Sequence, residues 1–179
     1  LRMGEASGRP ERFIGTHGMN PVHLTQGVEV VRHEKLAPEV LDFTLAMIRR
    51  IGKEPFVTAN VPGFIVNNGL LPWMIHFVNM LARGQATTQD IDTALIRSLG
   101  HPQGVFLLTD YIGINTTILV AEELYRATLD PRYLVPPLLY DMRRAGWDGF
   151  KTGRGFYDWS EPKNPKAIPL ERLTEAKGK

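Results

Sequence analysis

The pattern of apolar residues changes character once along the chain, at Pro62-Gly63, and this change restricts the folds that the sequence can adopt. Before it, short runs rich in β-branched and aromatic residues alternate with one amphipathic segment, which is the rhythm of an α/β sheet. After it, one amphipathic segment follows another, separated by glycine and proline. The sequence therefore predicts a mainly α protein, in which an all-helical domain follows a small α/β part of two or three strands and one helix.

The α/β part is expected to hold strands that are separated by a turn and by a helix. Its predicted strands are residues 12–17, 27–31 and 56–58, and its predicted helix is 37–51. Residues 18–21 should form a turn, because Asn20 precedes Pro21 and a residue before proline avoids the helical region. Glu29 alternates with valines, so its side chain should point to the opposite face of the strand from theirs.

The helical part is expected to contain five helices. They are predicted at residues 64–83, 87–99, from about 104, 114–128 and 137–145. Pro72 should kink the first helix, and Thr87 or Thr88 should cap the second, with Asp90 reaching back. A glycine-rich loop at 146–155 and an extended segment at 162–169 follow. The predicted domains are therefore residues 1–60, 61–160 and an extended tail at 161–179.

Composition and charge argue against several classes of function. The net charge is +2, with Lys and Arg spread along the chain, so we expect no nucleic-acid binding. The absence of cysteine excludes disulfides, thiolate metal sites and cysteine nucleophiles, and it is compatible with the cytoplasm. We therefore expect a cytoplasmic protein without a metal site. The start at Leu1, without a signal peptide, suggests a chain cut from something longer.

One apolar stretch, residues 63–82, is long enough to cross a bilayer. It contains Pro72, His76 and several asparagines, which are costly in a membrane. We interpret it as a buried helix and expect no membrane contact.

His17 and Glu29 form the candidate catalytic pair, since one ends a predicted strand and the other lies on the next. A carboxylate that is hydrogen-bonded to one imidazole nitrogen fixes the tautomer and stabilises the imidazolium that forms when the other nitrogen takes a proton. This would be a general base with its orienting group. From the spacing alone, an ordinary loop histidine and an edge-strand glutamate are the more common arrangement.

Several motifs, in order along nearly the whole chain, resemble the 3-hydroxyacyl-CoA dehydrogenase family, especially its bacterial 3-hydroxybutyryl-CoA members. The motifs are the stretches at residues 12–21, 27–31, 62–72, 100–104 and 151–157. The resemblance implies a helical carboxyl-terminal dehydrogenase domain, preceded by a remnant of an α/β Rossmann domain. It also implies oxidation of a 3-hydroxyacyl-CoA to a 3-ketoacyl-CoA with NAD, or the reverse reduction.

The resemblance assigns roles to five residues. His17 matches the catalytic base and Glu29 its partner, while Asn67 matches the residue that hydrogen-bonds the substrate. Asn20 and Lys151 match positions near the cofactor. The same resemblance implies a homodimer that forms through the helical domain. Each residue also has a structural alternative: a polar helix start for Asn67, a turn for Asn20 and a solvated loop for Lys151.

The sequence departs from the family pattern in two places. It contains no Gly-x-Gly-x-x-Gly turn, so the segment that cradles the pyrophosphate of NAD is missing and the chain alone should be inactive. Gly18 stands where the family usually has an aromatic residue. The main alternative function is a helical homodimerisation module without catalysis of its own. A third alternative is a two-domain dehydrogenase that acts on sugar acids or hydroxy acids.

Overall fold

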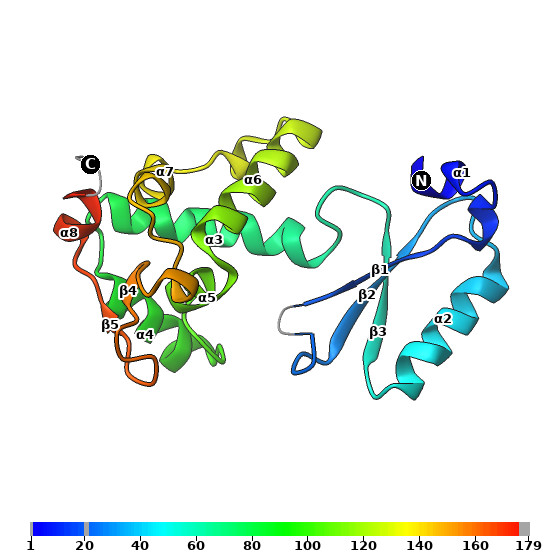
Figure 1. Cartoon of the computed structure of the whole chain (residues 1–179), viewed down its shortest axis with the longest axis horizontal. Coiled ribbons are helices and arrows are strands. Elements are labelled where there is room, and N and C mark those ends of the chain that lie inside the picture. Colours follow the sequence, from blue (N-terminus) through cyan, green and yellow to red (C-terminus); the bar gives the residue numbers. More distant parts are fainter. Residues whose placement is uncertain (1, 20–21, 176–179) are drawn as a thin grey trace. The chain divides into compact units, whose positions relative to one another are not determined.

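The structure is a computed structural model that describes residues 2–19 and 22–175, and the chain divides into two compact units (Figure 1). The first unit is Leu1–Asn68 and the second is Gly69–Lys179. This division falls within the first turn of helix α3 (Val66–Ala82), later than the boundary expected near residues 59–63. The division into domains at residues 60 and 61 stays a prediction.

The first unit is a three-stranded sheet with one long helix. The strands β1 (Gly15–Gly18), β2 (Gly27–Arg32) and β3 (Glu54–Ala59) lie in that order. β1 runs antiparallel to β2, whereas β2 and β3 are parallel and are joined through α2 (Pro38–Arg50). This strand–helix–strand crossover is the arrangement that the alternating sequence pattern predicted.

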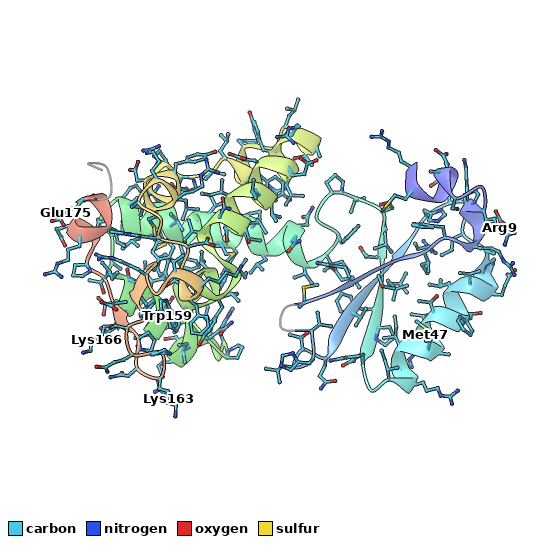
Figure 2. The ribbon with its side chains drawn as sticks, viewed as in Figure 1. Arg9, Met47, Trp159, Lys163, Lys166 and Glu175 are labelled. Atoms are coloured by element: carbon cyan, nitrogen blue, oxygen red, sulfur yellow. The ribbon has the colours of Figure 1, made fainter. Side chains whose placement is uncertain are left out.

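The helix α2 packs on the sheet through one face. Thr44 and Ile48 are buried on that face, whereas Phe43, Met47 and Ile51 are exposed on another. Figure 2 labels Met47 on this helix. Two short elements precede the sheet, α1 (Arg2–Ala6) and the 3-10 turn η1 (Pro10–Arg12).

The turn η1 corrects one predicted boundary. A strand was expected from residue 12, but β1 begins at Gly15. Pro10 begins the 3-10 turn, which continues through Arg12. Proline has a fixed φ and no amide hydrogen, so it favours the start of such a turn over a strand.

The second unit is helical, apart from one small hairpin. Its elements after α3 are α4 (Thr88–Leu99), α5 (Val105–Ile112), α6 (Ile114–Thr128), η2 (Pro131–Tyr133), α7 (Pro137–Arg144), η3 (Phe150–Thr152), β4 (Tyr157–Asp158), β5 (Lys166–Ala167) and α8 (Leu170–Thr174). The main core is formed by apolar residues of several helices, among them Val78, Leu81, Phe106, Ile118 and Met142. The predicted succession of helices is therefore confirmed.

The start and end of α4 follow from local chemistry. The Thr87 hydroxyl accepts a hydrogen bond from the Asp90 amide and donates one to the Asp90 carboxylate. Gly100 ends the helix in the left-handed conformation, with φ of 70°. Both features match the predicted cap and stop.

Residues 161–175 do not form the extended tail that the sequence predicts at 161–179, and residues 176–179 lie outside the described residues. β5 pairs with β4, and α8 follows directly after Pro169. Ile168 and Leu173 are buried in the main core. The prediction failed because α8 has only five residues, too few for a helical period to be visible in the sequence.

Within residues 2–19 and 22–175, no single helix is long and apolar enough to cross a membrane. Only α5 and α6 taken together meet those criteria, and they are bent by 92° relative to each other. Across the same residues, no group of three or more His, Asp or Glu side chains is placed to hold a metal ion.

Candidate active site

The strands β1 and β2 bring His17 and Glu29 directly opposite each other in the antiparallel register. His17 Nδ1 lies 2.6 Å from Glu29 Oε2. Residues directly opposite in antiparallel strands have side chains on the same face, so the pairing follows from the register. The predicted contact between these two side chains is confirmed.

The Glu29 carboxylate is fully buried, with 0% of the residue exposed. Its second oxygen, Oε1, accepts hydrogen bonds from the backbone amides of Ile65 at 2.9 Å and Val66 at 3.0 Å. These amides lie at the start of the 17-residue helix α3, where the helix dipole favours a negative charge. The burial of Glu29 is thus compensated by an imidazole on one oxygen and by two amides on the other.

The His17 ring is partly exposed, with one nitrogen bound to Glu29. Its side chain is 33% exposed, and its centroid lies 5.9 Å from that of the Phe64 ring, with 56° between the ring planes. Because Glu29 Oε2 accepts from Nδ1, the neutral imidazole carries its hydrogen on Nδ1 and keeps the lone pair on Nε2. Nε2 makes no hydrogen bond with any residue that the structure describes. It is therefore available to take a proton from a bound hydroxyl.

Two side chains donate hydrogen bonds to backbone carbonyl oxygens of the segment between β1 and β2. The Thr25 hydroxyl donates to the carbonyl oxygen of Met19 at 2.7 Å. Lys53 Nζ donates to the carbonyl oxygens of Val22 at 2.7 Å and Thr25 at 2.5 Å. Sequence reasoning did not identify Lys53, because a lysine after a helix usually lies in solvent. Asn20, predicted near the cofactor, lies outside the described residues.

Gly18 follows His17 directly and leaves room for a side chain. A Cβ added at this position would meet Val22 Cγ1 at 3.5 Å, an ordinary van der Waals contact. The structure therefore does not require glycine here on steric grounds.

The other two predicted site residues lie in different units. Asn67 is half-buried in the first turn of α3, within the first unit, and its side chain makes no hydrogen bond to a described residue. Lys151 belongs to the second unit, where its Nζ donates to the carbonyl oxygen of Ile112 at 3.3 Å. Ile112 is the last residue of α5, where a positive charge is favourable. Lys151 therefore also has a structural role.

The described residues do not form a cradle for a dinucleotide pyrophosphate. The connection from β2 to α2 is residues 33–37, which contain no glycine, and Pro38 opens the helix without an amide hydrogen. Dinucleotide-binding turns need glycines for close backbone approach and free amides at the helix start. The residues present therefore do not fit NAD without a further phosphate-binding segment.

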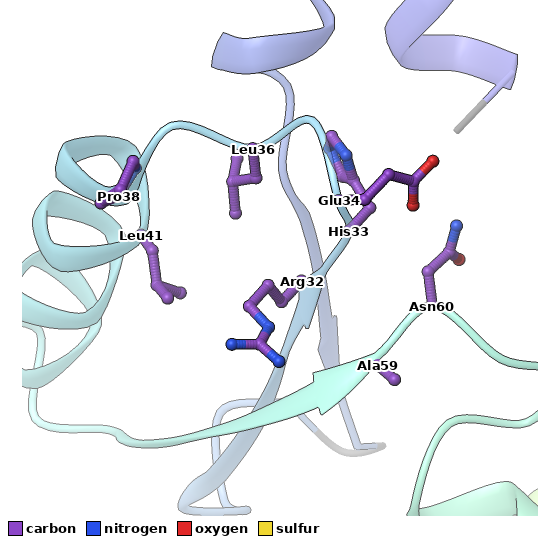
Figure 3. A pocket seen from close by; sticks show the side chains of 8 residues that line it. All are labelled: Arg32, His33, Glu34, Leu36, Pro38, Leu41, Ala59 and Asn60. Atoms are coloured by element: carbon purple, nitrogen blue, oxygen red, sulfur yellow. The ribbon is translucent and has the colours of Figure 1, made fainter.

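A cavity of about 610 Å³ lies at the carboxyl ends of β2 and β3 (Figure 3). Polar side chains reach it from Arg32, Glu34 and Asn60, and Leu36 and Leu41 are among its apolar lining residues. Neither His17 nor Glu29 lines it. The candidate active site is therefore defined by the contact between His17 and Glu29 and not by the size of this cavity.

A second cavity, of about 390 Å³, belongs to the second unit alone. It is lined by Leu70, Trp73, His101, Gln103 and Leu108 and their neighbours. His101 stacks on Trp73, with ring centroids 5.3 Å apart and 10° between the planes. This packing gives His101 a structural role in the second unit.

Two buried aspartates in the second unit were missed by sequence reasoning. Asp92 accepts hydrogen bonds from the amides of Phe106 and Leu107 and from the Tyr157 hydroxyl. Burial raises the pKa of Asp92, against the lowering effect of these donors. Burial likewise raises the pKa of Asp110 to about 6. Both carboxylates hold backbone segments in place, and neither lies in the same unit as His17.

Comparison with known proteins gives two matches to family models. The model of the 3-hydroxyacyl-CoA dehydrogenase NAD binding domain matches residues 1–61. The model of the 3-hydroxyacyl-CoA dehydrogenase C-terminal domain matches residues 63–159, which is more than half of the chain.

Individual relatives agree with these matches. The 3-hydroxybutyryl-CoA dehydrogenase of Bradyrhizobium diazoefficiens is 37% identical, over 94% of this chain and 56% of the relative. The mitochondrial hydroxyacyl-coenzyme A dehydrogenase of Sus scrofa is 35% identical, over 88% of this chain and 50% of the relative. The crystal structure of (S)-3-hydroxybutyryl-CoA dehydrogenase from Ralstonia eutropha superposes with a TM-score of 0.84 and 35% identity, covering 89% of this chain and 56% of that one. The chain thus spans about half the length of these relatives.

Proposed function

Since the chain belongs to the 3-hydroxyacyl-CoA dehydrogenase family, we propose that the protein containing it oxidises a 3-hydroxyacyl-CoA to a 3-ketoacyl-CoA, or catalyses the reverse reduction. The observation that carries the proposal is the 2.6 Å contact between His17 Nδ1 and the buried Glu29 carboxylate. A histidine oriented in this way is a general base, which the oxidation of a hydroxyl group requires.

In the proposed mechanism, Nε2 of His17 accepts the proton of the substrate hydroxyl. Glu29 holds the ring through Nδ1 and balances the positive charge that forms on the imidazole. In the reverse direction, the imidazolium returns the proton to the ketone oxygen. Asn67 is proposed to donate a hydrogen bond to the substrate near that oxygen, because its side-chain amide has no partner among residues 2–19 and 22–175.

When bound, NAD would accept the hydride that leaves the carbon bearing the substrate hydroxyl group. We propose that a segment outside this chain holds its pyrophosphate, because the described residues form no phosphate cradle. Asn20 and Lys151 are proposed to lie near the cofactor. On this basis the 179-residue chain alone should not oxidise or reduce substrate. A cytoplasmic location stays a prediction.

The test compares NADH oxidation by the longer protein, with acetoacetyl-CoA as substrate, for wild type and His17→Gln. The variant should lose about 10²–10⁴-fold in kcat, the usual contribution of positioned acid–base catalysis. His23→Gln serves as the control, since His23 is exposed and follows on the same chain segment. Equal rates for wild type and His17→Gln would remove the proposed base.

A second candidate function, homodimerisation through the helical part, is favoured by exposed apolar side chains of the second unit. Leu119 on α6 is 54% exposed, and Leu129 after it is 73% exposed. A contiguous exposed apolar patch often marks a contact between copies, and we propose that these leucines belong to such a patch. Sedimentation of the chain tests this role: a dimer that Leu119→Lys weakens supports it, whereas a monomer contradicts it.

A further inference from the structure

The turn Gly63–Val66 contacts the His17-Glu29 pair through both backbone and side chain. The amides of Ile65 and Val66 bind Glu29 Oε1, and the Phe64 ring packs against His17. We propose that this turn is a positioning element of the same site and that Glu29 ties the orientation of the base to the start of α3. The inference rests on the proposed function and deepens it.

The buried charge of Glu29 strengthens its contact with the turn Gly63–Val66. A buried carboxylate is costly unless its charge is compensated, and the partners of Glu29 are His17 and the two amides of the turn. Successive amides in such a turn form a concavity that binds anions, and the start of α3 adds its helix dipole. Moving the turn away would remove the compensation on one oxygen. The carboxylate that holds His17 is therefore stable in place only while the turn is docked.

The backbone of the turn is bent in an unusual way to make these contacts. Gly63 has φ of 78° and Phe64 has φ of 50°, so two consecutive residues lie in the left-handed region. This conformation costs a non-glycine residue such as phenylalanine conformational energy. The packing of Phe64 on His17 and the binding of Glu29 by the next two amides offset this cost. These contacts explain the Pro-Gly-Phe part of the motif at 62–72.

The anchor also sets the position of Asn67. This residue follows Val66 directly, and Val66 is the first residue of α3. Fixing the Val66 amide on Glu29 fixes the backbone that carries the Asn67 side chain. One carboxylate thereby holds the proposed base with one oxygen and the backbone of the proposed substrate-binding residue with the other.

Two substitutions at one position separate these roles. In Glu29→Gln, the amide oxygen can still accept from Ile65 and Val66, while the NH₂ group donates to His17 Nδ1. His17 must then carry its hydrogen on Nε2, so it cannot act as a base. Glu29→Ala removes both roles. Glu34→Ala is the control, because Glu34 is an exposed glutamate that follows the same strand.

The first test is amide hydrogen exchange by NMR on the 179-residue chain. The amides of Val30 and Val31 in β2 serve as the internal reference. Against this reference, Glu29→Ala should increase the exchange rates of the Ile65 and Val66 amides about 10-fold or more over wild type, because these amides lose hydrogen bonds to a charged group. The exchange rates should stay within about 3-fold of wild type in Glu29→Gln, where an acceptor remains. Unchanged protection at Ile65 and Val66 in Glu29→Ala would overturn the proposal, as would an equal acceleration throughout β2.

The second test is steady-state kinetics of the longer protein. Both variants should lower kcat by about 10²–10⁴-fold, but only Glu29→Ala should also raise KM for the acyl-CoA substrate, by about 10-fold. Equal KM values in the two variants would contradict the anchoring role. Absence of NADH oxidation in the wild type would remove the proposed function instead, and the exchange experiment would still decide the anchoring role.

Discussion

Asp110 gives the sharpest prediction about the stability of the second unit. Its carboxylate accepts hydrogen bonds from the amides of Phe156 and Tyr157, both at 2.9 Å, and from Trp159 Nε1 at 2.8 Å. These hydrogen bonds hold residues 156–159 against α5, which carries Asp110, and Trp159 is labelled in Figure 2. The Asp110 pKa is raised from 3.8 to about 6, chiefly by burial and to a smaller extent by the nearby Asp92 charge, while the three N–H donors act to lower it.

The direction of the pH effect follows from this shift. The folded-state pKa lies above the unfolded one, so the contribution to stability is fully present below pH 3.8 and is lost as the pH rises through about 6. The full shift corresponds to about 3 kcal/mol. Between pH 8 and pH 5 the linked change in the free energy of unfolding is about 1.4 kcal/mol in favour of the acidic side.

Urea unfolding of the chain at pH 5 and pH 8, followed by tryptophan fluorescence, measures this change. All three tryptophans lie in the second unit, so the signal reports that unit. For each protein, the free energy of unfolding at pH 8 is subtracted from that at pH 5. The value for Asp110→Asn is then subtracted from the value for wild type, which cancels the contributions of other titrating groups. A positive value is expected. A value of zero or below would refute the reasoning, because it would mean that the three N–H donors outweigh burial and keep Asp110 ionised.

Three further substitutions test other parts of the second unit by the same urea assay. Gly155→Ala should destabilise by about 1–3 kcal/mol, because the added Cβ overlaps the Asp110 carboxylate, whereas Gly69→Ala, where a Cβ meets nothing within 4 Å, should not. Thr87→Ala should cost about 1 kcal/mol through the lost cap of α4, and unchanged stability would exclude that role. Leu173→Ala should cost about 2–5 kcal/mol, because the Leu173 side chain of α8 is fully buried in the core, and a smaller loss would contradict that packing.

The contact between His17 and Glu29 could be predicted because it depends on strand alternation and on a short antiparallel connection. The second set of Glu29 partners could not, because the amides of Ile65 and Val66 are backbone groups that any residue would supply. The only sequence signal for them was the Pro-Gly-Phe turn, which suggests unusual dihedral angles but does not name the group that binds there.

The buried aspartates were missed for a different reason. Asp92 and Asp110 lie on amphipathic helices, where an acidic residue is usually solvated. The signal lay in glycines far away in sequence, since a Cβ at Gly104 would overlap Asp92 and one at Gly155 would overlap Asp110. Each of the motifs at 100–104 and 151–157 therefore contains a glycine, Gly104 or Gly155, that leaves room for a buried carboxylate.

The position of β1 in the sheet affects how self-association of the chain should be interpreted. Among the described residues β1 pairs only with β2, so one side of this strand has free amide and carbonyl groups. Such an edge can recruit a strand from another molecule. Reversible oligomers of the purified chain could then form by sheet extension instead of helix packing. Sheet extension would respond to a proline introduced at Thr16 but not to a charge at Leu119, so the two routes can be separated.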